Sequence, residues 1–326
     1  MRYLRNDNTD PLYNMAFDEY ALEQLPLDEP LFFLWQNSPA VIIGLNQNVY
    51  SEVNSDYLRQ HGITLARRVT GGGAVYHDLG NLNYTIVGRS ADLERDYPEY
   101  ARHMLRALQA LGVDAELSGR NDILVGGRKV SGYAKRVYKD RLMVHGTLMY
   151  DVDLDRLTAA LTPSAEKLTS KGIASVRSRV TNLRQHLPQV FDINDFRHQL
   201  ERHLSRNYED KEYPLSDEQL ATITYMRNHK FATYEWVYGR SPHTALARTA
   251  RFACGSIEAH LDITEGLIAR CHICGDFMGN LPTSDIESLL QGVRYERDAL
   301  RERIVQTDIS LYFDHLTTEE FLSLLI

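Results

Sequence analysis

Long apolar runs are missing from this chain of 326 residues. A membrane-spanning helix needs roughly 20 consecutive apolar residues, and residues 1–7 lack the pattern of a secretory signal. The chain also lacks an excess of positive charge, because 36 Lys and Arg stand against 44 Asp and Glu, for a net charge of −8. We therefore expect a cytoplasmic protein whose partners include no nucleic acid and no membrane.

Cysteine is scarce and comes late in the chain. The three cysteines are Cys254, Cys271 and Cys274, which fits a reducing compartment better than a disulfide framework. Acyl transfer through a thioester needs an activated thiolate, and residues 1–253 offer none. Cys271 and Cys274 would point to opposite faces of a strand, and no second pair of zinc ligands follows them. We interpret these cysteines as incidental.

Glycine and basic residues are concentrated in one segment, residues 67–78, in which Gly71, Gly72 and Gly73 follow Arg67 and Arg68. Glycines let the backbone bend tightly and let its amide groups approach an anion closely. Guanidinium groups match carboxylates and phosphates in geometry. The segment therefore indicates either an anion-binding loop or a glycine-rich hairpin with two solvent-exposed arginines.

A second basic segment covers residues 119–132. Residues 123–125 are typical of a buried strand, Gly126-Gly127 of a two-residue hairpin turn, and the chain from Lys129 of a returning strand. This pattern places Lys129 on a rigid element beside a tight turn. An ammonium group held there could bridge two anionic groups.

A third basic segment, residues 167–182, mixes small hydroxyl residues with Lys171, Arg177 and Arg179 and shows no strand or helix period. Such a pattern is typical of a polyphosphate-binding loop or of a charged surface loop. His145 lies in a predicted strand, where it could act as a general base, although a single strand histidine is more often part of a hydrogen-bonded structure.

Helix and strand patterns surround these segments. We expect a helix over residues 14–24 with Asp18, Glu19 and Glu23 on its solvent face, and a helix over residues 98–111. Strands are predicted over 31–35, 40–45 and, in the last part of the chain, 250–256, 257–263 and 267–274. Capping boxes that begin at Ser216 and Thr317 predict two further helices.

Four motifs occur in order: RRVTGGGAVYH, GRNDILVGGRKVSG, HGTL and KLTSKGIASVRSRVTNL. Together they closely resemble bacterial lipoate–protein ligases of the biotin/lipoate ligase superfamily, and the resemblance continues through YGRSP and GDFMG. It implies an α+β fold with a mixed-sheet catalytic domain that binds lipoate and ATP. Loss of periodicity after residue 231 places the domain boundary at 245, so we expect a catalytic domain over 1–245 and a small α+β accessory domain over 246–326.

The resemblance also implies a reaction. Lipoate would be activated by ATP with Mg²⁺ to lipoyl-AMP. The lipoyl group would then pass to a lysine of a lipoyl domain, as in 2-oxoacid dehydrogenase E2 subunits, or of glycine cleavage H protein. Two alternatives stay open, a cysteine-independent lipoyl or octanoyl transferase and a non-catalytic protein that binds lipoate or lipoyl-AMP.

The resemblance assigns roles to individual residues, with Lys129 as the catalytic residue and Asp122 as the ligand of Mg²⁺. The expected lipoate site consists of Arg68, Gly71, Gly72, Gly73, Ala74, Val75, Tyr76, Lys129 and His145. The expected ATP and adenylate site consists of Gly73, Asn121, Asp122, Lys129, Ser131, Gly132, Lys171, Gly172, Ser175, Val176 and Arg177.

Overall fold

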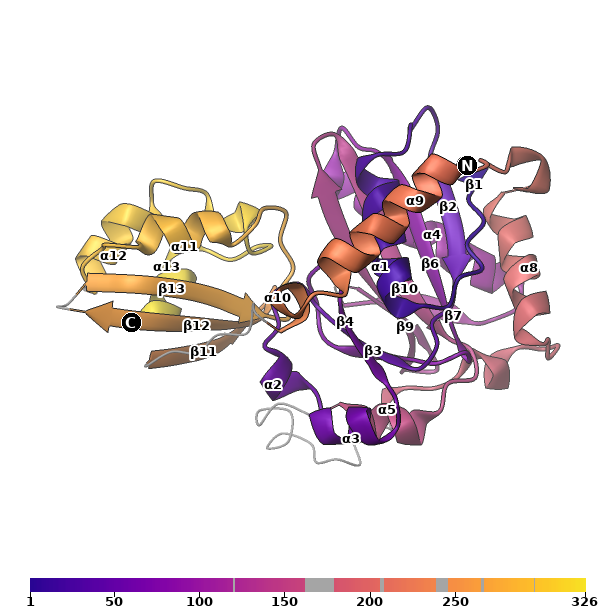
Figure 1. Ribbon diagram of the computed structural model, residues 1–326, viewed down its shortest axis with the longest axis horizontal. Helices are drawn as coiled ribbons and strands as arrows, with labels where there is room; N and C mark the ends of the chain where they lie inside the picture. The colour runs from indigo at the N-terminus through magenta and orange to yellow at the C-terminus, as the bar shows by residue number, and fades with distance from the viewer. Residues whose placement is uncertain (120, 162–178, 206–207, 239–245, 265–266, 296) are drawn as a thin grey trace.

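The structure of the protein is a computed structural model that describes residues 1–119, 121–161, 179–205, 208–238, 246–264, 267–295 and 297–326. It has two lobes side by side (Figure 1). We call residues 1–238 the N-terminal lobe and residues 246–326 the C-terminal lobe. No described helix is long and apolar enough to cross a membrane.

A seven-stranded sheet forms the centre of the N-terminal lobe. Only its edge pair, β1 with β2, is parallel, and every other neighbouring pair is antiparallel, so the expected mixed sheet is confirmed. The strands, in spatial order, are β1 (Arg2–Tyr3), β2 (Leu31–Trp35), β6 (Asn81–Arg89), β10 (Arg141–Met149), β9 (Arg128–Tyr138), β8 (Asp122–Val125) and β7 (Ala115–Ser118).

A second sheet of three strands carries the glycine-rich segment. Its spatial order is β4 (Thr64–Arg67), β3 (Ala40–Ile43) and β5 (Val75–His77), with β3 parallel to β4 and antiparallel to β5. Because β4 and β5 lie on either side of β3, residues 68–74 must pass over the end of β3. We call residues 68–74 the glycine loop. Its Thr70 carbonyl accepts a hydrogen bond from the Leu45 amide at 2.8 Å.

Helices cover both faces of the large sheet. Side chains of β2 alternate between two hydrophobic clusters, because successive residues of a strand point to opposite faces. Phe32 and Leu34 join the cluster that includes α4 and α8, whereas Leu31, Phe33 and Trp35 join the cluster that includes α1. Among the described residues of this lobe, the α-helices are α1 (Pro11–Glu23), α2 (Val49–Glu52), α3 (Ser55–Gln60), α4 (Leu93–Ala110), α5 (Leu154–Ala160), α8 (Ile193–Leu204), α9 (Asp217–Met226) and α10 (Tyr234–Val237).

The expected solvent face of α1 is wrong. Asp18 and Glu19 are 1% and 3% exposed. Glu19 pairs with Lys230 at 2.7 Å and with Arg136 at 3.3 Å, and Asp18 bonds to strand residues described below. Both carboxylates therefore face into the protein, where each finds a partner.

Both helices predicted in the first third of the chain begin earlier than expected. The side chain of Asp10 accepts the Leu12 amide and caps α1 at Pro11. The side chain of Asp92 accepts the Arg95 amide and starts α4 at Leu93, so Pro98 lies inside that helix. Each capping aspartate lies outside the apolar period from which the helix was predicted.

The C-terminal lobe is an antiparallel meander with helices on one face. The strands are β11 (Leu246–Phe252), β12 (Gly255–Thr264) and β13 (Leu267–Gly275). The predictions over 257–263 and 267–274 are confirmed, whereas the prediction over 250–256 is wrong in its bounds, because the turn between β11 and β12 lies at residues 253–254. The helices α11 (Ser284–Leu290), α12 (Arg297–Ile304) and α13 (Thr318–Leu325) pack on this sheet around a separate hydrophobic cluster. The capping boxes predicted at Ser216 and Thr317 are both present.

The two lobes meet beside the glycine loop. The Gly275 amide donates to the carbonyl of Asn46, and Lys135 pairs with Asp314 at 3.1 Å. A Cβ atom at Gly71 would lie 2.4 Å from the carbonyl oxygen of Phe277, so only glycine fits at this contact. The glycine loop is therefore part of the interface between the lobes.

Candidate functional site

A cavity of about 1150 Å³ lies between the glycine loop and the β8–β9 hairpin. Strand β9, which carries Lys129, and the glycine loop are far apart in the sequence, and both line this cavity. Lys129 and the glycine loop therefore share one cavity. The predicted residues that line it are Arg68, Gly72, Gly73, Ala74, Val75, Asn121, Asp122, Lys129, Gly132 and His145.

Three predicted residues do not line the cavity. Gly71 packs against the C-terminal lobe. Tyr76 lies between cavity-lining Val75 and His77, so strand alternation turns it toward a hydrophobic cluster on the other side of β5. Ser131 is fully buried in β9 beside cavity-lining Gly132. For Tyr76, the prediction overlooked the alternation of side chains along a strand. For Ser131, it overlooked a register shift between β8 and β9, after which Gly132 and not Ser131 lines the cavity together with Lys129.

The third basic segment falls mostly outside the described residues. This applies to the predicted nucleotide-binding residues Lys171, Gly172, Ser175, Val176 and Arg177. The chain is described again from residue 179, and there Arg179 and Val180 line the cavity. Val180 forms a parallel bridge with Lys129, and the Thr181 amide donates to the Lys129 carbonyl at 3.0 Å.

Lys129 lies at the start of β9, beside the predicted Gly126-Gly127 turn. Its Nζ atom is 2.7 Å from Asp122 Oδ1, and the two side chains are 34% and 36% exposed. A Cβ atom at Gly132 would lie 2.7 Å from Nζ and 2.9 Å from Cε of Lys129, so glycine makes room for the lysine side chain. The ammonium and the carboxylate are thus paired with each other and still accessible from the cavity.

Arg67 is not an anion-binding residue, contrary to one expectation. Its side chain is fully buried, and its guanidinium donates hydrogen bonds of 2.7–3.2 Å to five backbone carbonyls. These carbonyls belong to Gly44, Leu45, Gln47, Trp236 and Val237. The alternative of a solvent-exposed arginine is also wrong, because Arg67 joins the end of β3 to the end of the N-terminal lobe.

The Arg68 guanidinium also donates hydrogen bonds within the protein. Its guanidinium donates to the carbonyls of Ile42, Gly71 and Gly73 and, at 3.0 Å, to the Thr70 hydroxyl. Burial lowers its pKa to about 10, so it stays charged at neutral pH. Arg68 therefore holds the glycine loop in shape while its charge faces the cavity.

His145 is part of a buried hydrogen-bond chain. Its Nδ1 is 2.6 Å from Asp18 Oδ2, and its Nε2 is 2.7 Å from the Thr70 hydroxyl. Asp18 also accepts from Thr85, which accepts from Trp35. A carboxylate only accepts, so Nδ1 of His145 carries a proton and donates it to Asp18. Thr70 is 1% exposed, so this chain supports the hydrogen-bonded alternative for His145.

His77 and Asn83 add polar groups that sequence reasoning did not assign to a ligand. Both are buried and line the cavity, and neither His77 Nε2 nor Asn83 Nδ2 has a partner among the described residues. Burial lowers the pKa of His77 to about 3, helped by the charge of Arg68, which keeps the ring neutral. A bound molecule can therefore offer these atoms a hydrogen-bond partner.

The C-terminal lobe supplies part of the cavity wall, which the sequence did not indicate. Arg251, Asp276 and Met278 line the cavity, and Asp276 is close enough to raise the pKa of Arg68 slightly against the effect of burial. In the sequence, only the GDFMG motif at residues 275–279 pointed to this part of the cavity wall, and the resemblance gave that motif no role. Among the described residues, no cysteine lines the cavity.

Comparison with known proteins identifies the family. Residues 10–205 match the model of the lipoyl protein ligase A/B catalytic domain, and residues 241–325 match that of the bacterial lipoate protein ligase C-terminus. A Bacillus subtilis (strain 168) protein named lipoate-protein ligase LplJ is 39% identical over 330 residues, covering 100% of both chains.

Two solved structures are each similar to about three-quarters of this chain. One is a bi-partite lipoate protein ligase from Thermoplasma acidophilum, described with its E2 lipoyl domain (29% identity, TM-score 0.66, 75% of this chain and 98% of that chain). The other is a lipoate-protein ligase A bound with ATP (30% identity, TM-score 0.62, 73% of this chain and 98% of that chain). With both of its lobes matched by models of one family and its full length matched by a named relative, the chain belongs to the lipoate–protein ligases.

Proposed function

We propose that this protein activates lipoate with ATP to lipoyl-AMP and transfers the lipoyl group to a lysine of an acceptor protein. The observation that carries the proposal is the shared cavity, in which Lys129 is accessible opposite the glycine loop. The family membership supplies the substrates, and the ATP-bound relative supports ATP. We assign residues 1–245 to a catalytic domain and residues 246–326 to an accessory domain.

The first step joins two anions. A carboxylate oxygen of lipoate attacks the α-phosphorus of ATP, the bond from that phosphorus to the bridging oxygen breaks, and pyrophosphate leaves. Charge grows on the phosphoryl oxygens, so positioned cations and N–H groups provide most of the catalysis. We assign Lys129 to contact the carboxylate and the α-phosphate together, since its side chain is accessible from the cavity. Gly72, Gly73 and Arg68 line the same cavity, and we assign their amide groups and the guanidinium charge to the developing anion.

Asp122 suits a divalent cation such as Mg²⁺. Its carboxylate lines the cavity, is partly exposed, and already balances the charge of Lys129. Hard oxygen ligands of this kind, completed by substrate phosphates, are what Mg²⁺ prefers. The ion would neutralise phosphate charge, and Asp122 would hold it there.

The second step forms an amide. The ε-amine of an acceptor lysine attacks the acyl carbon of lipoyl-AMP, the bond from that carbon to the phosphate oxygen breaks, AMP leaves, and the amine loses a proton. The lipoyl domain described with the Thermoplasma relative supports a lipoyl domain as acceptor, and glycine cleavage H protein is a second candidate. We place the reaction in the cytoplasm.

One part of the nucleotide site is assigned from the sequence. Lys171, Gly172, Ser175, Val176 and Arg177 are proposed to bind the nucleotide. The cavity-lining position of Arg179 and the pairing of Val180 with Lys129 put the end of this segment at the site. Limited proteolysis tests this assignment. We expect ATP and lipoate, added together, to protect the segment from cleavage.

The proposed function is tested by exchange of labelled pyrophosphate into ATP. We expect exchange only when lipoate is present, because pyrophosphate must react with lipoyl-AMP to regenerate ATP. Competition by octanoate and biotin measures substrate choice, and we expect biotin not to compete. Binding of lipoate without exchange would favour the non-catalytic alternative. Transfer to an apo lipoyl domain, with its acceptor lysine replaced by arginine as control, tests the second step.

A further inference from the structure

The sheet of the C-terminal lobe carries a cluster of three metal-ligand types on one face. Glu258 on β12 lies directly opposite Cys274 on β13, and His260 follows two residues after Glu258 on the same face of β12. The alternate residues Ile257 and Ala259 belong to the hydrophobic cluster under the helices. Strand register therefore brings a carboxylate, an imidazole and a thiol together on the other face.

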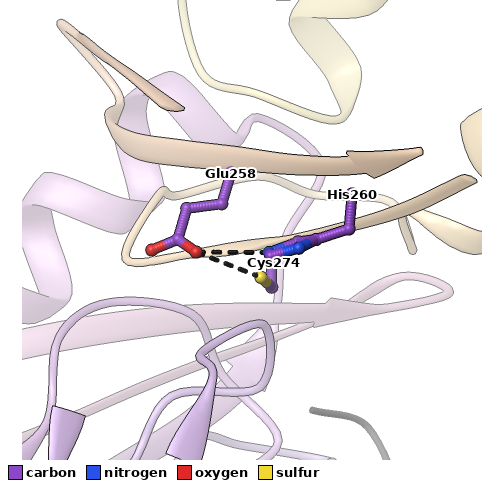
Figure 2. A group of neighbouring side chains, drawn as sticks. All are labelled: Glu258, His260 and Cys274. Carbon is purple, nitrogen blue, oxygen red and sulfur yellow. Dashed lines mark hydrogen bonds and ion pairs between the residues drawn. The ribbon is translucent and has the colours of Figure 1, made fainter. Parts of the chain in front are cut away.

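The donor atoms of the cluster lie close to one another (Figure 2). His260 Nε2 is 3.3 Å from Glu258 Oε2, Cys274 Sγ is 4.0 Å from the same oxygen, and all three donor atoms lie within 4.8 Å of one another. In a tetrahedral zinc site, bond lengths of about 2.0–2.3 Å separate neighbouring ligand atoms by about 3.4–3.6 Å. Small rotations of these side chains reach that spacing.

Burial and ligand chemistry favour a borderline cation. Cys274 is 1% exposed and His260 is 9% exposed, while the side chain of Glu258 is 24% exposed. Thiolate and imidazole select zinc over the hard cations Mg²⁺ and Ca²⁺, which take oxygen ligands. We propose that Glu258, His260 and Cys274 form a site for a zinc-type divalent cation, with an exchangeable water as the remaining ligand.

This site is separate from the proposed magnesium site in ligand type and in place. None of its three residues lines the large cavity. Figure 2 shows the three side chains projecting from the strands toward the pale violet ribbons of the N-terminal lobe. Gly275, next to Cys274, donates its amide to Asn46 of that lobe. An ion bound here would stiffen the C-terminal sheet at its contact with the N-terminal lobe.

Cys271 provides a matched control. It lies on β13 three residues before Cys274, and it packs toward the hydrophobic cluster on the other face of the sheet. The earlier expectation that the two cysteines point to opposite faces is therefore correct. The expectation that both cysteines are incidental is replaced for Cys274. Its proposed co-ligands, Glu258 and His260, lie on β12 and not in the segment around Cys271 and Cys274.

The test measures binding of Zn²⁺ to the full chain without nucleotide. We expect one equivalent for the wild-type protein and for Cys271→Ser, and a loss of affinity of at least about 100-fold for Cys274→Ser, since even removal of a group that only orients a ligand costs 10–100-fold. Glu258→Gln and His260→Asn should also bind more weakly. Asp122→Asn should bind as wild type does, which separates this site from the large cavity.

A second measurement needs no variant. Co²⁺ bound to the wild-type chain should show a thiolate-to-metal charge-transfer band, and the band should persist in Cys271→Ser. Absence of the band in the wild-type protein would overturn the proposal even if Cys274→Ser failed to fold. Equal Zn²⁺ affinity of folded Cys274→Ser and Cys271→Ser would overturn it as well.

Discussion

The two basic, glycine-punctuated segments look alike in sequence and use their charges in different ways. In residues 67–77, the guanidinium groups of Arg67 and Arg68 are buried and donate to backbone carbonyls of their own protein. In residues 121–132, the ammonium of Lys129 and the carboxylate of Asp122 are about one-third exposed and face the cavity. Basic residues beside glycines therefore shape the site in one segment and are accessible to substrates in the other.

The largest expected effect tests the structural side of this comparison. Replacing Arg67 by Met removes donors to five backbone carbonyls, three of them in buried bonds. We expect a loss of at least about 3 kcal/mol in the free energy of unfolding, because a buried acceptor left unpaired is costly. Urea unfolding followed by tryptophan fluorescence measures it. Arg95→Met, at a 69% exposed side chain, should change stability by less than about 0.5 kcal/mol. A loss below about 1 kcal/mol for Arg67→Met would contradict the structural role.

The next effect tests the catalytic side. Lys129→Ala should fold normally and lose about 10²–10³-fold in the rate of lipoyl-AMP formation, as expected for removal of one positioned charge. Single-turnover formation of the adenylate measures the loss, with circular dichroism as the check on folding. Arg128→Ala is the control, since this neighbour is exposed and outside the cavity lining. Near-normal adenylate formation by folded Lys129→Ala would reject the role of Lys129.

Gly132→Ala should have a smaller effect on the rate, because it displaces the ammonium group of Lys129 without removing its charge. The new Cβ would lie 2.7 Å from Lys129 Nζ, and the flexible side chain should move aside at little cost in stability. We expect roughly a tenfold loss in exchange rate, because misplacing a reacting group costs rate steeply. In a Lys129→Ala background the same substitution should cause no further loss, and an additive loss would point to a different cause.

A pH dependence of stability is expected from the first segment. The pKa of His77 falls from 6.5 to about 3 in the folded protein, chiefly through burial. Below pH 6.5 the unfolded chain binds a proton that the folded protein does not, so stability falls as the pH drops toward 3, by up to about 1.4 kcal/mol per pH unit. Urea unfolding of wild type and His77→Gln at pH 7 and pH 5 should show a shallower loss in the variant, and equal losses would refute this assignment.

Local patterns in the sequence predicted local structure well. β2 has the expected bounds, and Lys129 lies where the hairpin pattern put it, because strand alternation and a Gly-Gly turn act over a few residues. The burial of Asp18 was missed because its partners, Thr85 and His145, are 67 and 127 positions away. Arg67 was misread for the same reason, since Val237 is 170 positions away. Helix period alone cannot distinguish a carboxylate in water from one paired across the fold.

The sequence also could not show that the C-terminal lobe helps to line the cavity. Its strands and helices follow from local patterns, but the docking of Asp276 and Met278 beside the glycine loop depends on contacts between two separately packed units. The same limit applies to Glu258, His260 and Cys274. Their adjacency comes from the pairing of two strands, which spacing within one strand does not reveal.

The contact between Gly71 and the carbonyl of Phe277 sets the mutational tolerance of this position from outside its own lobe. Every missense change of a glycine codon adds at least a Cβ atom, and here that atom would wedge the lobes apart beside the glycine loop. If the two lobes were produced as separate polypeptides, the absence of a side chain at Gly71 would leave room for the Phe277 carbonyl when the lobes reassociate.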